Sequence, residues 1–525
     1  MPVNPTYPGL YIEELPNLAH TIVPAPTSIT VFVGYAHPFL GECAKNHRWR
    51  EAIEIFNFSE YERMFGGLFR STFADSSLAY AVNQFFLNGG SDCYVVALEP
   101  KYFLRTNLST EEPIGPSTII VDSNIKFTSK QLTDVTKMTI TIGSVRKTVA
   151  DNDTADIVIS YGRSVETYRG VRLTALPDES YIQTMLADSE LVSVAPSTGA
   201  YTPTFTPGLA PSELNTMPTP VLGTNFTTFR PLDYNEVFKD DSSLDKVEIF
   251  NLMALPGVSD TGVWGNALAF CHNKRAFLIL DPPANASADG SSGLAILDFA
   301  TSGNVPTSYP NAALYFPYLT SADPISGDLI PLPPSGSVAG LYARTDTNRG
   351  VWKAPAGLET VIANVNGVVA EGRLTDLKQG KLNPKGVNVI RQFPGDSPVI
   401  WGARTTVTNN AGFEQWRYIP VRRMALFLEQ SLLRSLGWVV FEPNADPLWS
   451  AIRLSIEGFM LSLYRQNAFF GTTPREAFLV KCDRETTTEA DINLGKVNIL
   501  VGFRPLKPAE FVIIKIAQLA GQAPG

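Results

Sequence analysis

The sequence predicts a multidomain protein of mixed α/β and α+β class. Its 525 residues are too many for a single hydrophobic core, so about two to four domains are expected. Segments with the apolar spacing of helices alternate with short strand-like segments in residues 28–99 and again from residue 222 onward. Between them, Thr, Ser and Val become frequent and turns are dense. We therefore expect an α/β middle domain, residues 28–99 and 222–398, that is interrupted by an inserted β-rich domain, residues 100–221.

The first part of the middle domain alternates between strands and helices. Ser28–Ala36 is an apolar run typical of a buried strand. Phe58–Gly67 and a helix at Ser76–Leu87 follow, and Asn88–Gly90 supplies residues that commonly end a helix. Cys93–Leu98 again has strand composition. This order predicts an α/β arrangement.

The inserted domain contains short segments of strand composition at Ile119–Val121, Met138–Ile142 and Asp156–Ile159. Val194–Pro220 is rich in Pro and Thr, which is typical of a linker, and we expect it to return the chain to the middle domain. We expect this domain to lie on the outside of the protein. Its role stays open at this point.

The middle domain resumes with a strand-like segment at Val247–Pro256, a helix at Gly262–His272 and a strand at Ala276–Asp281. Pro282–Pro334 is expected to be rich in loops. Val387–Arg404 then leads into a closing domain, which we assign to residues 399–505.

Two helices are predicted in the closing domain. Arg417–Leu436 carries apolar residues at helical spacing, and Gly437 follows where a left-handed cap is expected. Asp446 and Pro447 are typical of a helix start, since Asp caps free N–H groups and Pro is favoured at the first helical position. The buried stripe of this second helix is expected to be Trp449, Ile452, Ile456, Phe459 and Leu463.

Three strand-like segments follow: Ala477–Cys482, Lys496–Phe503 and Phe511–Ile516. Pro505 and Pro508 lie between the last two, and proline lacks the N–H group that a sheet ladder needs. We therefore assign residues 506–525 to a C-terminal arm, whose strand need not pair with its own neighbour.

Residues 1–27 have a similar character at the other end. Leu10–Leu15 is a short strand candidate that cannot continue into a hairpin through Pro16, and Asn17–Pro26 resembles a loop. The pattern favours an N-terminal arm that carries a strand away from the body. An edge strand of the same subunit is the alternative.

A series of motifs along the chain resembles one known family. In the second half they are GLYARTDTNRGVWKAPAG (Gly340–Gly357), VIWGARTTV (Val399–Val407), RRMALFLEQSL (Arg422–Leu432), FEPNADPLWSAI (Phe441–Ile452), REAFLVKCDRETTT (Arg475–Thr488) and KPAEFVIIKI (Lys507–Ile516). Near the start they are YPGLYIEELP, ITVFVGYA and FFLNGGSDCYVV. In this order they resemble the contractile tail sheath proteins of phages, R-type tailocins and extracellular contractile injection systems. The resemblance covers residues 7–98 and 247–516, and the insertion matches no pattern of the family.

The resemblance implies a structural and mechanical subunit rather than an enzyme. It implies stacked hexameric rings around an inner tube, baseplate and terminal cap partners, and contraction from a metastable extended state that drives the tube through a target envelope. Each closing domain would be completed by strands exchanged between subunits. The expected exchange residues are Leu10, Tyr11, Ile12, Glu13, Glu14, Leu15, Phe511, Val512, Ile513, Ile514, Lys515 and Ile516. A static virion tail component, such as a tube or baseplate subunit, is the alternative.

Basic residues on the closing helices are candidate contacts with the inner tube. Exposed ion pairs are individually weak and screened by salt, which suits a tube that must be held and then released. We expect exposed side chains at Arg422, Arg423, Arg434, Arg453 and Arg465. A solvated helix face, or pairing within the sheath, is the alternative.

No catalytic, cofactor or metal site is expected. The sequence has no GxSxG, HExxH, Walker A or GxGxxG motif. Its four histidines lack the spacing of metal ligands. Asp151–Asp156 resembles a calcium loop but lacks the glycine and the terminal glutamate, so an acidic turn is expected. Gly257–Gly262, with the sequence GVSDTG, is expected to be a strand-to-helix turn.

Composition limits the partners. A net charge of −9 argues against a dedicated nucleic-acid binder. No apolar run reaches the ~18 residues that span a bilayer, and the N-terminus has no signal-peptide pattern. The scattered cysteines, Cys43, Cys93, Cys271 and Cys482, indicate buried reduced thiols. We expect assembly in the cytoplasm of the producing bacterium, and then a place in a virion or phage tail-like particle.

Overall fold

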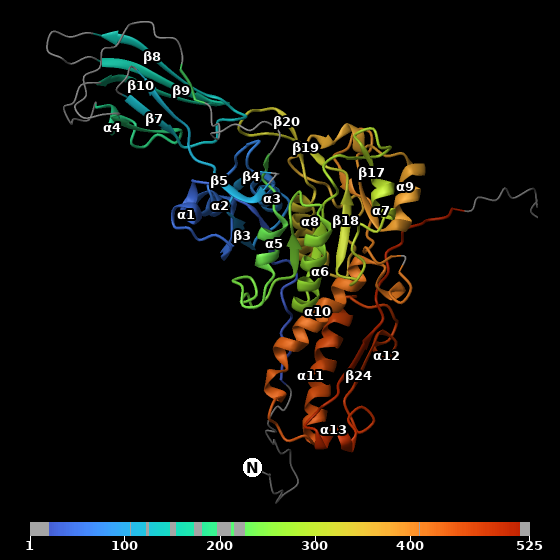
Figure 1. Ribbon diagram of the computed structural model, residues 1–525. Coiled ribbons are helices and arrows are strands. Elements are labelled where there is room, and N and C mark those ends of the chain that lie inside the picture. Colours follow the sequence, from blue (N-terminus) through green and yellow to red (C-terminus); the bar gives the residue numbers. More distant parts are fainter. Residues whose placement is uncertain are drawn as a thin grey trace, which may run out of the picture. The chain divides into compact units, whose positions relative to one another are not determined.

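The computed structural model describes residues 20–104, 107–121, 125–146, 154–172, 181–196, 212–214, 226–408 and 410–514 (Figure 1). Its chain divides into two compact units. The larger unit consists of Pro26–Asn348 and Pro355–Arg417, and the smaller unit contains the described residues 20–25, Arg349–Ala354 and 418–514. The sequence places the start of the closing domain at residue 399, whereas residues 399–417 belong to the larger unit. The reason is that β23 (Val399–Ile400) pairs with β22 (Val387–Arg391).

An eight-stranded sheet organises the larger unit, in the order β2-β3-β1-β14-β15-β18-β22-β23. The strands from β3 to β22 run parallel, while β2 and β23 pair antiparallel at the two edges. The remaining bounds are β1 Thr30–Tyr35, β2 Ala52–Ile55, β3 Cys93–Leu98, β14 Leu252–Ala254, β15 Phe277–Leu280 and β18 Ala312–Phe316. Every residue of β1, β14, β15 and β18 is buried, as in parallel sheets that are covered on both faces.

Helices cover both faces of this sheet. On one face, the ring of Phe32 in β1 lies edge-on to Phe85 of α3, with centroids 5.4 Å apart. On the other face, Val33 joins a buried cluster that contains Trp264 of α6. The helices and 3-10 turns are α1 Gly41–Lys45, α2 Phe58–Phe65, α3 Ser77–Leu87, α5 Pro231–Val237, α6 Thr261–Lys274, α7 Ile296–Thr301, α8 Ser335–Arg349, α9 Asp376–Leu382, η1 Ala370–Gly372, η2 Asn383–Lys385 and η3 Glu414–Trp416. The helices predicted at Ser76–Leu87 and Gly262–His272 are therefore confirmed, as α3 and α6.

The sequence does not predict the strand β18. It lies in Pro282–Pro334, a segment that is expected to be rich in loops. Its sequence AALYF is buried between β15 and β22. The same segment contains α7, β16 (Ala286–Ser287), β17 (Leu294–Ala295), β19 (Leu319–Ala322) and β20 (Leu329–Leu332), and β21 (Gly367–Val368) pairs with β19. A short apolar run without alternation carries little strand signal, and burial between neighbouring strands decides its conformation.

The inserted residues 100–221 form mostly strands where they are described. One antiparallel sheet contains β10 (Ser164–Arg172), β9 (Thr154–Tyr161), β8 (Met138–Arg146) and β12 (Ser212–Leu214), in that order. A second contains β11 (Val192–Pro196), β7 (Ile125–Ser129) and β6 (Thr118–Val121). Their buried side chains form a separate hydrophobic cluster, to which Ile182 of α4 (Ile182–Met185) also belongs. The insertion therefore has a core of its own.

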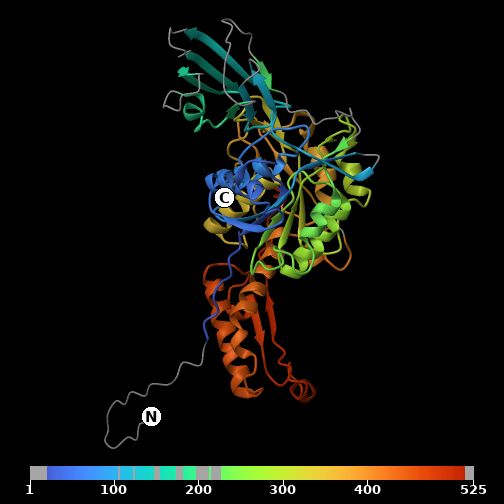
Figure 2. The ribbon, with the colours of Figure 1, turned by 60° about the vertical axis from the view of Figure 1, so that its left-hand side comes forward.

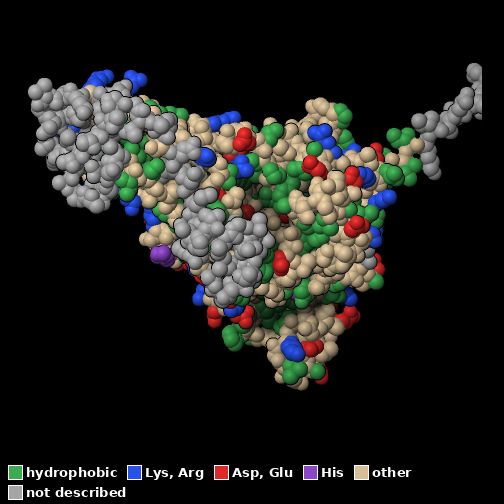
Figure 3. Space-filling view, turned by 45° about the horizontal axis from the view of Figure 1, so that its top comes forward, with side chains coloured by type: hydrophobic (Ala, Val, Ile, Leu, Met, Phe, Trp, Pro, Cys, Tyr) green, Lys and Arg blue, Asp and Glu red, His purple; other side chains and the backbone are tan. Residues whose placement is uncertain are grey.

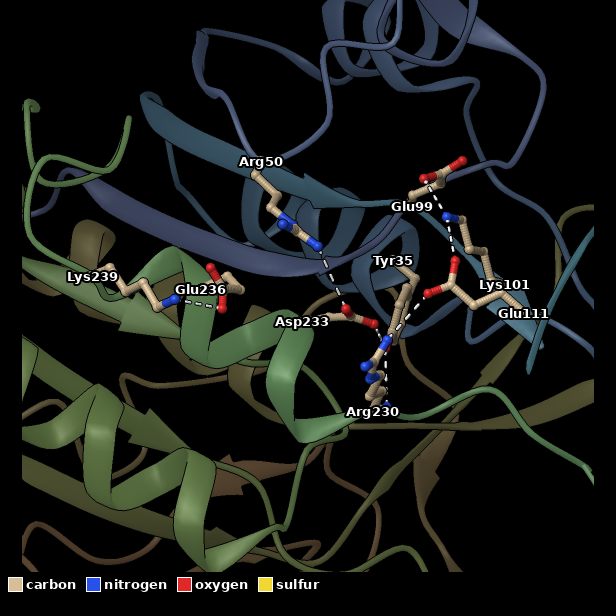
Figure 4. A network of polar contacts seen from close by, with 9 residues as sticks. All are labelled: Tyr35, Arg50, Glu99, Lys101, Glu111, Arg230, Asp233, Glu236 and Lys239. Carbon is tan, nitrogen blue, oxygen red and sulfur yellow. Dashed lines mark hydrogen bonds and ion pairs between the residues drawn. The ribbon is translucent and has the colours of Figure 1, made fainter. Parts of the chain in front are cut away.

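A third sheet, β13-β4-β5, lies where the insertion leaves and re-enters the middle region; its strands are Phe226–Thr227, Lys101–Leu104 and Asn107–Pro113. Charged side chains tie it to β1 and α5 (Figure 4). Glu111 lies 2.8 Å from Lys101 Nζ and 3.2 Å from Arg230 Nη1. Asp233 accepts a hydrogen bond of 3.4 Å from the Tyr35 hydroxyl and lies 3.5 Å from Arg50. These contacts fix the root of the insertion on the parallel sheet.

Candidate assembly site

The smaller unit is built on two long helices, α10 (Ile419–Ser435) and α11 (Asp446–Arg465), with the 3-10 turn η4 (Gly437–Val439) between them. The predicted stripe of α11 is confirmed. All five of its side chains are buried in one cluster that also contains Met424 and Phe427 of α10: Trp449, Ile452, Ile456, Phe459 and Leu463.

The helix ends differ from the sequence expectation. The C-cap of α10 is Leu436, with a φ of −97°, and Gly437 begins η4 instead of adopting a left-handed cap. Ala445 is the N-cap of α11, so Asp446 lies in the first turn, where its charge favours the positive end of the helix dipole. Asp446 also forms an exposed ion pair of 3.0 Å with Arg484.

A two-stranded antiparallel sheet packs against these helices. Its strands are β24 (Phe478–Lys481) and β25 (Leu500–Phe503), shorter than the predicted Ala477–Cys482 and Lys496–Phe503. The short helix α12 (Pro474–Ala477) precedes β24, and α13 (Glu489–Asn493) lies between the two strands in sequence, with a capping box formed by Thr488 at its start. Alternate side chains face the helix cluster, namely Phe478, Val480, Val501 and Phe503.

This sheet is incomplete. Neither β24 nor β25 has a second ladder partner among the described residues. An isolated pair of strands is marginally stable, and each open edge presents unpaired N–H and C=O groups to another chain. On the outward face, Leu479 and Leu500 are 48% and 51% exposed. The unit therefore offers open strand edges beside apolar side chains that lack cover.

The predicted strand Phe511–Ile516 is not formed in its described part. Residues 511–514 have no regular secondary structure, and each of their side chains is at least 74% exposed. Four consecutive large apolar side chains in water are unfavourable for an isolated chain. No strand lies beside this segment among the described residues, and the strand was expected to form with another subunit, so it stays a prediction. Lys515 and Ile516 fall outside the described residues.

The chain leading to this segment is fixed to the smaller unit. The Phe470 N–H donates to the Arg504 carbonyl at 2.9 Å, and the Arg504 guanidinium lies over the Phe470 ring at 4.5 Å. The Tyr418 hydroxyl then donates to Glu510 at 3.4 Å. The exposed segment begins directly after this contact.

The N-terminal side of the chain is also fixed. Residues 20–25 run along α10 and α11 (Figure 2). Three of their N–H groups donate to helix serines. Sequence reasoning missed these serines, Ser431, Ser435 and Ser455. Ser431 and Ser435 lie one turn apart in α10, but this helix also carries Arg, Glu and Gln residues, so the spacing of the serines does not single them out. The predicted strand Leu10–Leu15 lies outside the described residues.

The five candidate tube-contact arginines fall into three groups. Arg422 and Arg423 are buried, so their expected exposure is wrong. Burial lowers the pKa of Arg422 from its ordinary value, and Glu429, at 3.3 Å, partly opposes that shift. Arg453 is half-buried and donates to the Cys482 carbonyl at 3.1 Å. Arg434 and Arg465 are exposed.

Several expectations about chemistry can be compared with the described residues. No group of three or more His, Cys, Asp or Glu side chains among them could hold a metal ion. All four cysteines are free and buried, as predicted. The GVSDTG segment is a strand-to-helix turn between β14 and α6, as predicted. The Asp151–Asp153 part of the acidic turn lies outside the described residues.

Two further observations concern partners. None of the helices within the described ranges is long and apolar enough to cross a bilayer. On the face shown in Figure 3, acidic and basic side chains are interspersed rather than separated by sign. Nucleic-acid-binding proteins typically gather basic residues into a patch or stripe, and this face does not have that character.

Comparison with known proteins relates this geometry to a family. Two family models match adjoining parts of the chain: the phage tail sheath protein central domain at residues 237–406 and the phage tail sheath C-terminal domain at residues 413–518. Together they cover more than half of the sequence. The tail sheath protein of Vibrio phage KVP40 is 23% identical over 193 residues, which are 37% of this chain and 27% of that protein. The chain thus spans about a quarter of the length of this curated relative.

Solved structures share the fold over nearly the whole chain. The helical sheath of the anti-feeding prophage in its contracted state is 24% identical, with a TM-score of 0.57, and the match covers 98% of this chain and 100% of that one. A chain from the six-fold symmetrised baseplate of the anti-feeding prophage gives the same identity and TM-score, covering 98% of this chain and 99% of that one. From the matched domains, the relatives and the fold, we conclude that this chain belongs to the phage tail sheath family.

Proposed function

We propose that this chain is the subunit of a contractile sheath. Copies would polymerise as stacked hexameric rings around an inner tube and contract from a metastable extended state, driving the tube through a target envelope. The observation that supports this most directly is that one unit contains both an open-edged sheet, β24–β25, and an exposed apolar segment, residues 511–514, that is not paired with it. Each lacks what the other provides, a strand and a sheet edge.

Strand exchange between copies would satisfy both. Residues 511–516 of one copy, and Leu10–Leu15 of another, would add to the open edges of β24–β25. Such an arm could make about four to six ladder hydrogen bonds at ~0.5–1.5 kcal/mol each. Burial of side chains such as Val512 and Ile514, which are 81% and 79% exposed, would add ~1.5–3 kcal/mol each.

The gross gain is on the order of 10 kcal/mol for one arm, and association entropy opposes much of it. A single arm would therefore be marginal, whereas two arms to different neighbours would link copies into a mesh. The contact is head-to-tail, so it extends into an open helical lattice rather than closing into a dimer. Compact units joined only by such arms could repack while the strands stay paired, which would allow two lattices of different free energy.

The partners proposed for the assembly follow from the same scheme. Arg434 and Arg465 are the exposed members of the candidate set for contacts with the inner tube. Baseplate and terminal cap proteins would close the two ends of the polymer. Assembly in the bacterial cytoplasm, followed by incorporation into a virion or a phage tail-like particle, fits a chain whose four cysteines are free.

The C-terminal arm gives the sharpest test. Ile513→Pro removes a ladder donor from a segment that is already irregular and exposed, so the monomer should keep its melting temperature. We expect electron microscopy to show that the wide, hollow, helically ridged cylinders formed by the parent protein are lost. Ile513→Thr, which keeps the N–H group and the strand preference, is the matched control and should assemble. Normal cylinders from the proline variant would exclude strand exchange by this arm.

A further inference from the structure

The chain immediately after the predicted N-terminal strand is held by its own subunit. We call residues 20–25 the strap. The N–H groups of His20, Val23 and Ala25 donate to the hydroxyls of Ser455, Ser435 and Ser431, at 3.1, 3.1 and 2.9 Å. Figure 2 shows the strap in blue beside α10 and α11. The strap thus crosses from α11 to α10 without forming a sheet.

The spacing of the serines matches an extended chain. Ser431 and Ser435 are one helical turn apart, which corresponds to about 6 Å along the axis. Val23 and Ala25 are two residues apart in a strap that lacks helical structure, which corresponds to about 6.6 Å in an extended chain. Successive hydroxyls along α10 therefore meet alternate N–H groups of the strap.

The serines can hold the strap without losing their own contacts. The Ser431 hydroxyl donates to the Phe427 carbonyl at 2.7 Å, and the Ser455 hydroxyl donates to the Ala451 carbonyl at 2.8 Å. A hydroxyl has one proton and two lone pairs, so each serine can also accept from the strap. Alanine at these positions would remove the acceptor from all three strap N–H groups, of which that of Ala25 is buried.

Side chains add to this attachment. Ile22 is 5% exposed and belongs to the helix cluster that contains Trp449. The His20 ring stacks on Trp438, with centroids 3.9 Å apart. Val23 points the other way and is 66% exposed. The strap is therefore held along its length by both backbone and side chains.

We infer that the serine track Ser431, Ser435 and Ser455 is the fixed anchor of the N-terminal arm. It sets how far the arm reaches and passes tension from the arm to α10 and α11. The partner is a second copy of this chain, whose β24–β25 edge receives the strand at Leu10–Leu15. The span from Leu15 to His20 is at most roughly 18 Å, so the receiving edge lies within that distance of the anchor. This inference rests on the proposed strand exchange.

The anchor itself can be tested in the monomer. In the triple variant Ser431→Ala, Ser435→Ala and Ser455→Ala, we expect amide hydrogen exchange in residues 20–25 to become about tenfold faster. Ser462→Ala is the control, because its hydroxyl donates to the Phe459 carbonyl on α11 and holds no strap residue. Unchanged exchange in the triple variant would overturn the anchor. If amide hydrogen exchange becomes faster but the variant still forms cylinders with normal yield and normal resistance to urea, the mechanical role of the anchor is overturned.

The reach of the arm provides a second test that leaves the serines intact. Deleting Asn17–Ala19 shortens the span from Leu15 to His20 to at most about 7 Å. We expect this variant to lose cylinders while strap exchange stays at the parent rate. Replacing Asn17–Ala19 with Gly-Ser-Gly keeps the length and should restore assembly. Normal assembly by the shortened variant would overturn the fixed anchor.

A deletion of residues 1–16 separates this inference from the proposed function. If that deletion still forms contractile cylinders, the exchange of the N-terminal strand fails, whatever the strap measurements show. If it loses cylinders with unchanged strap exchange, the strand exchange stands, and the two tests above decide the role of the anchor.

Discussion

The two units of this protein differ in how completely each buries its own sheet. In the larger unit, eight strands pair in one sheet and helices cover both faces. In the described part of the smaller unit, two strands pair with both edges open, and an apolar segment at residues 511–514 lies exposed. The larger unit covers both faces of its central sheet with its own helices. The smaller unit leaves strand edges and apolar side chains open to another chain.

This difference separates stability from assembly. Substitutions in the larger unit should mainly change the free energy of unfolding of the isolated chain. Substitutions at the open sheet should mainly change polymerisation.

The largest change is expected at the core of the larger unit. Trp264 is fully buried, and its Nε1 donates to the Val258 carbonyl at 3.0 Å. Trp264→Ala should lower the free energy of unfolding by ~3–5 kcal/mol, because it removes a large apolar side chain and leaves a cavity. Phe441→Ala in the smaller unit is the control, since that side chain is fully exposed. Chemical denaturation of the two variants measures the contrast, and equal effects would contradict it.

The next largest effect is a pH dependence whose sign at Asp281, in the larger unit, is opposite to that at two carboxyl groups of the smaller unit. Asp281 in the larger unit accepts hydrogen bonds from the Ser335 and Gly257 N–H groups, yet burial raises its pKa from the ordinary 3.8 to about 6. A raised pKa in the folded state gives a stabilising contribution that is complete below about pH 4 and is lost as the pH rises to about 6. The change is on the order of 3 kcal/mol.

In the smaller unit, hydrogen bonds from Thr472 hold the pKa of Glu476 below its ordinary range, and those from Thr488 do the same for Asp491. Their stabilising contribution is present at neutral pH and is lost on acidification. Melting curves recorded from about pH 3.5 to about pH 6.5, a range that includes the ordinary pKa values of carboxyl groups, measure the pH dependence of stability in both units. Asp281→Asn should flatten the trend of the larger unit. An unchanged slope in that variant would assign the effect to another group.

The sequence predicted some of these features and not others, for physical reasons. The stripe of α11 is predictable because Trp449, Ile452 and Ile456 repeat with the helix period. The structure buries these side chains in the cluster shared with α10. β18 was missed because its conformation depends on strands distant in sequence. The predicted exposure of Arg422 is wrong because the sequence of one helix does not show which basic residue becomes buried, here with Glu429 as its ion-pair partner.

The candidate site was only partly visible in the sequence. The prolines around residue 505 indicated a segment that leaves its neighbours, and the segment after Glu510 is exposed. The strap contacts were not visible, because a hydroxyl that accepts from a chain more than 400 residues away leaves no periodic pattern. Contacts of this kind require the fold.

A smaller change is expected on the inner face of the open sheet. Val480 is 7% exposed and packs in the α10–α11 cluster, so Val480→Ala should lower the free energy of unfolding by ~1–3 kcal/mol. Leu479, its neighbour on the outward face, is 48% exposed, so Leu479→Ala should change it by less than ~0.5 kcal/mol. If the outward face contacts another copy, Leu479→Ala should nevertheless reduce the yield of cylinders. If both variants form cylinders in normal yield, the assignment of this sheet to assembly is contradicted.

The smallest change in stability is expected at the exposed arginines. Arg465→Glu should leave the free energy of unfolding within ~0.5 kcal/mol of the parent, because surface charges contribute little to it. If Arg465 contacts the inner tube, charge reversal replaces attraction with repulsion, and electron microscopy should show sheaths that lack a tube. Arg475→Glu on α12 makes the same charge change at another exposed position, and its sheaths should stay filled. Tube-filled sheaths from both variants would remove Arg465 from the tube contact, and the attraction would have to come from other residues, of which Arg434 is the remaining exposed candidate.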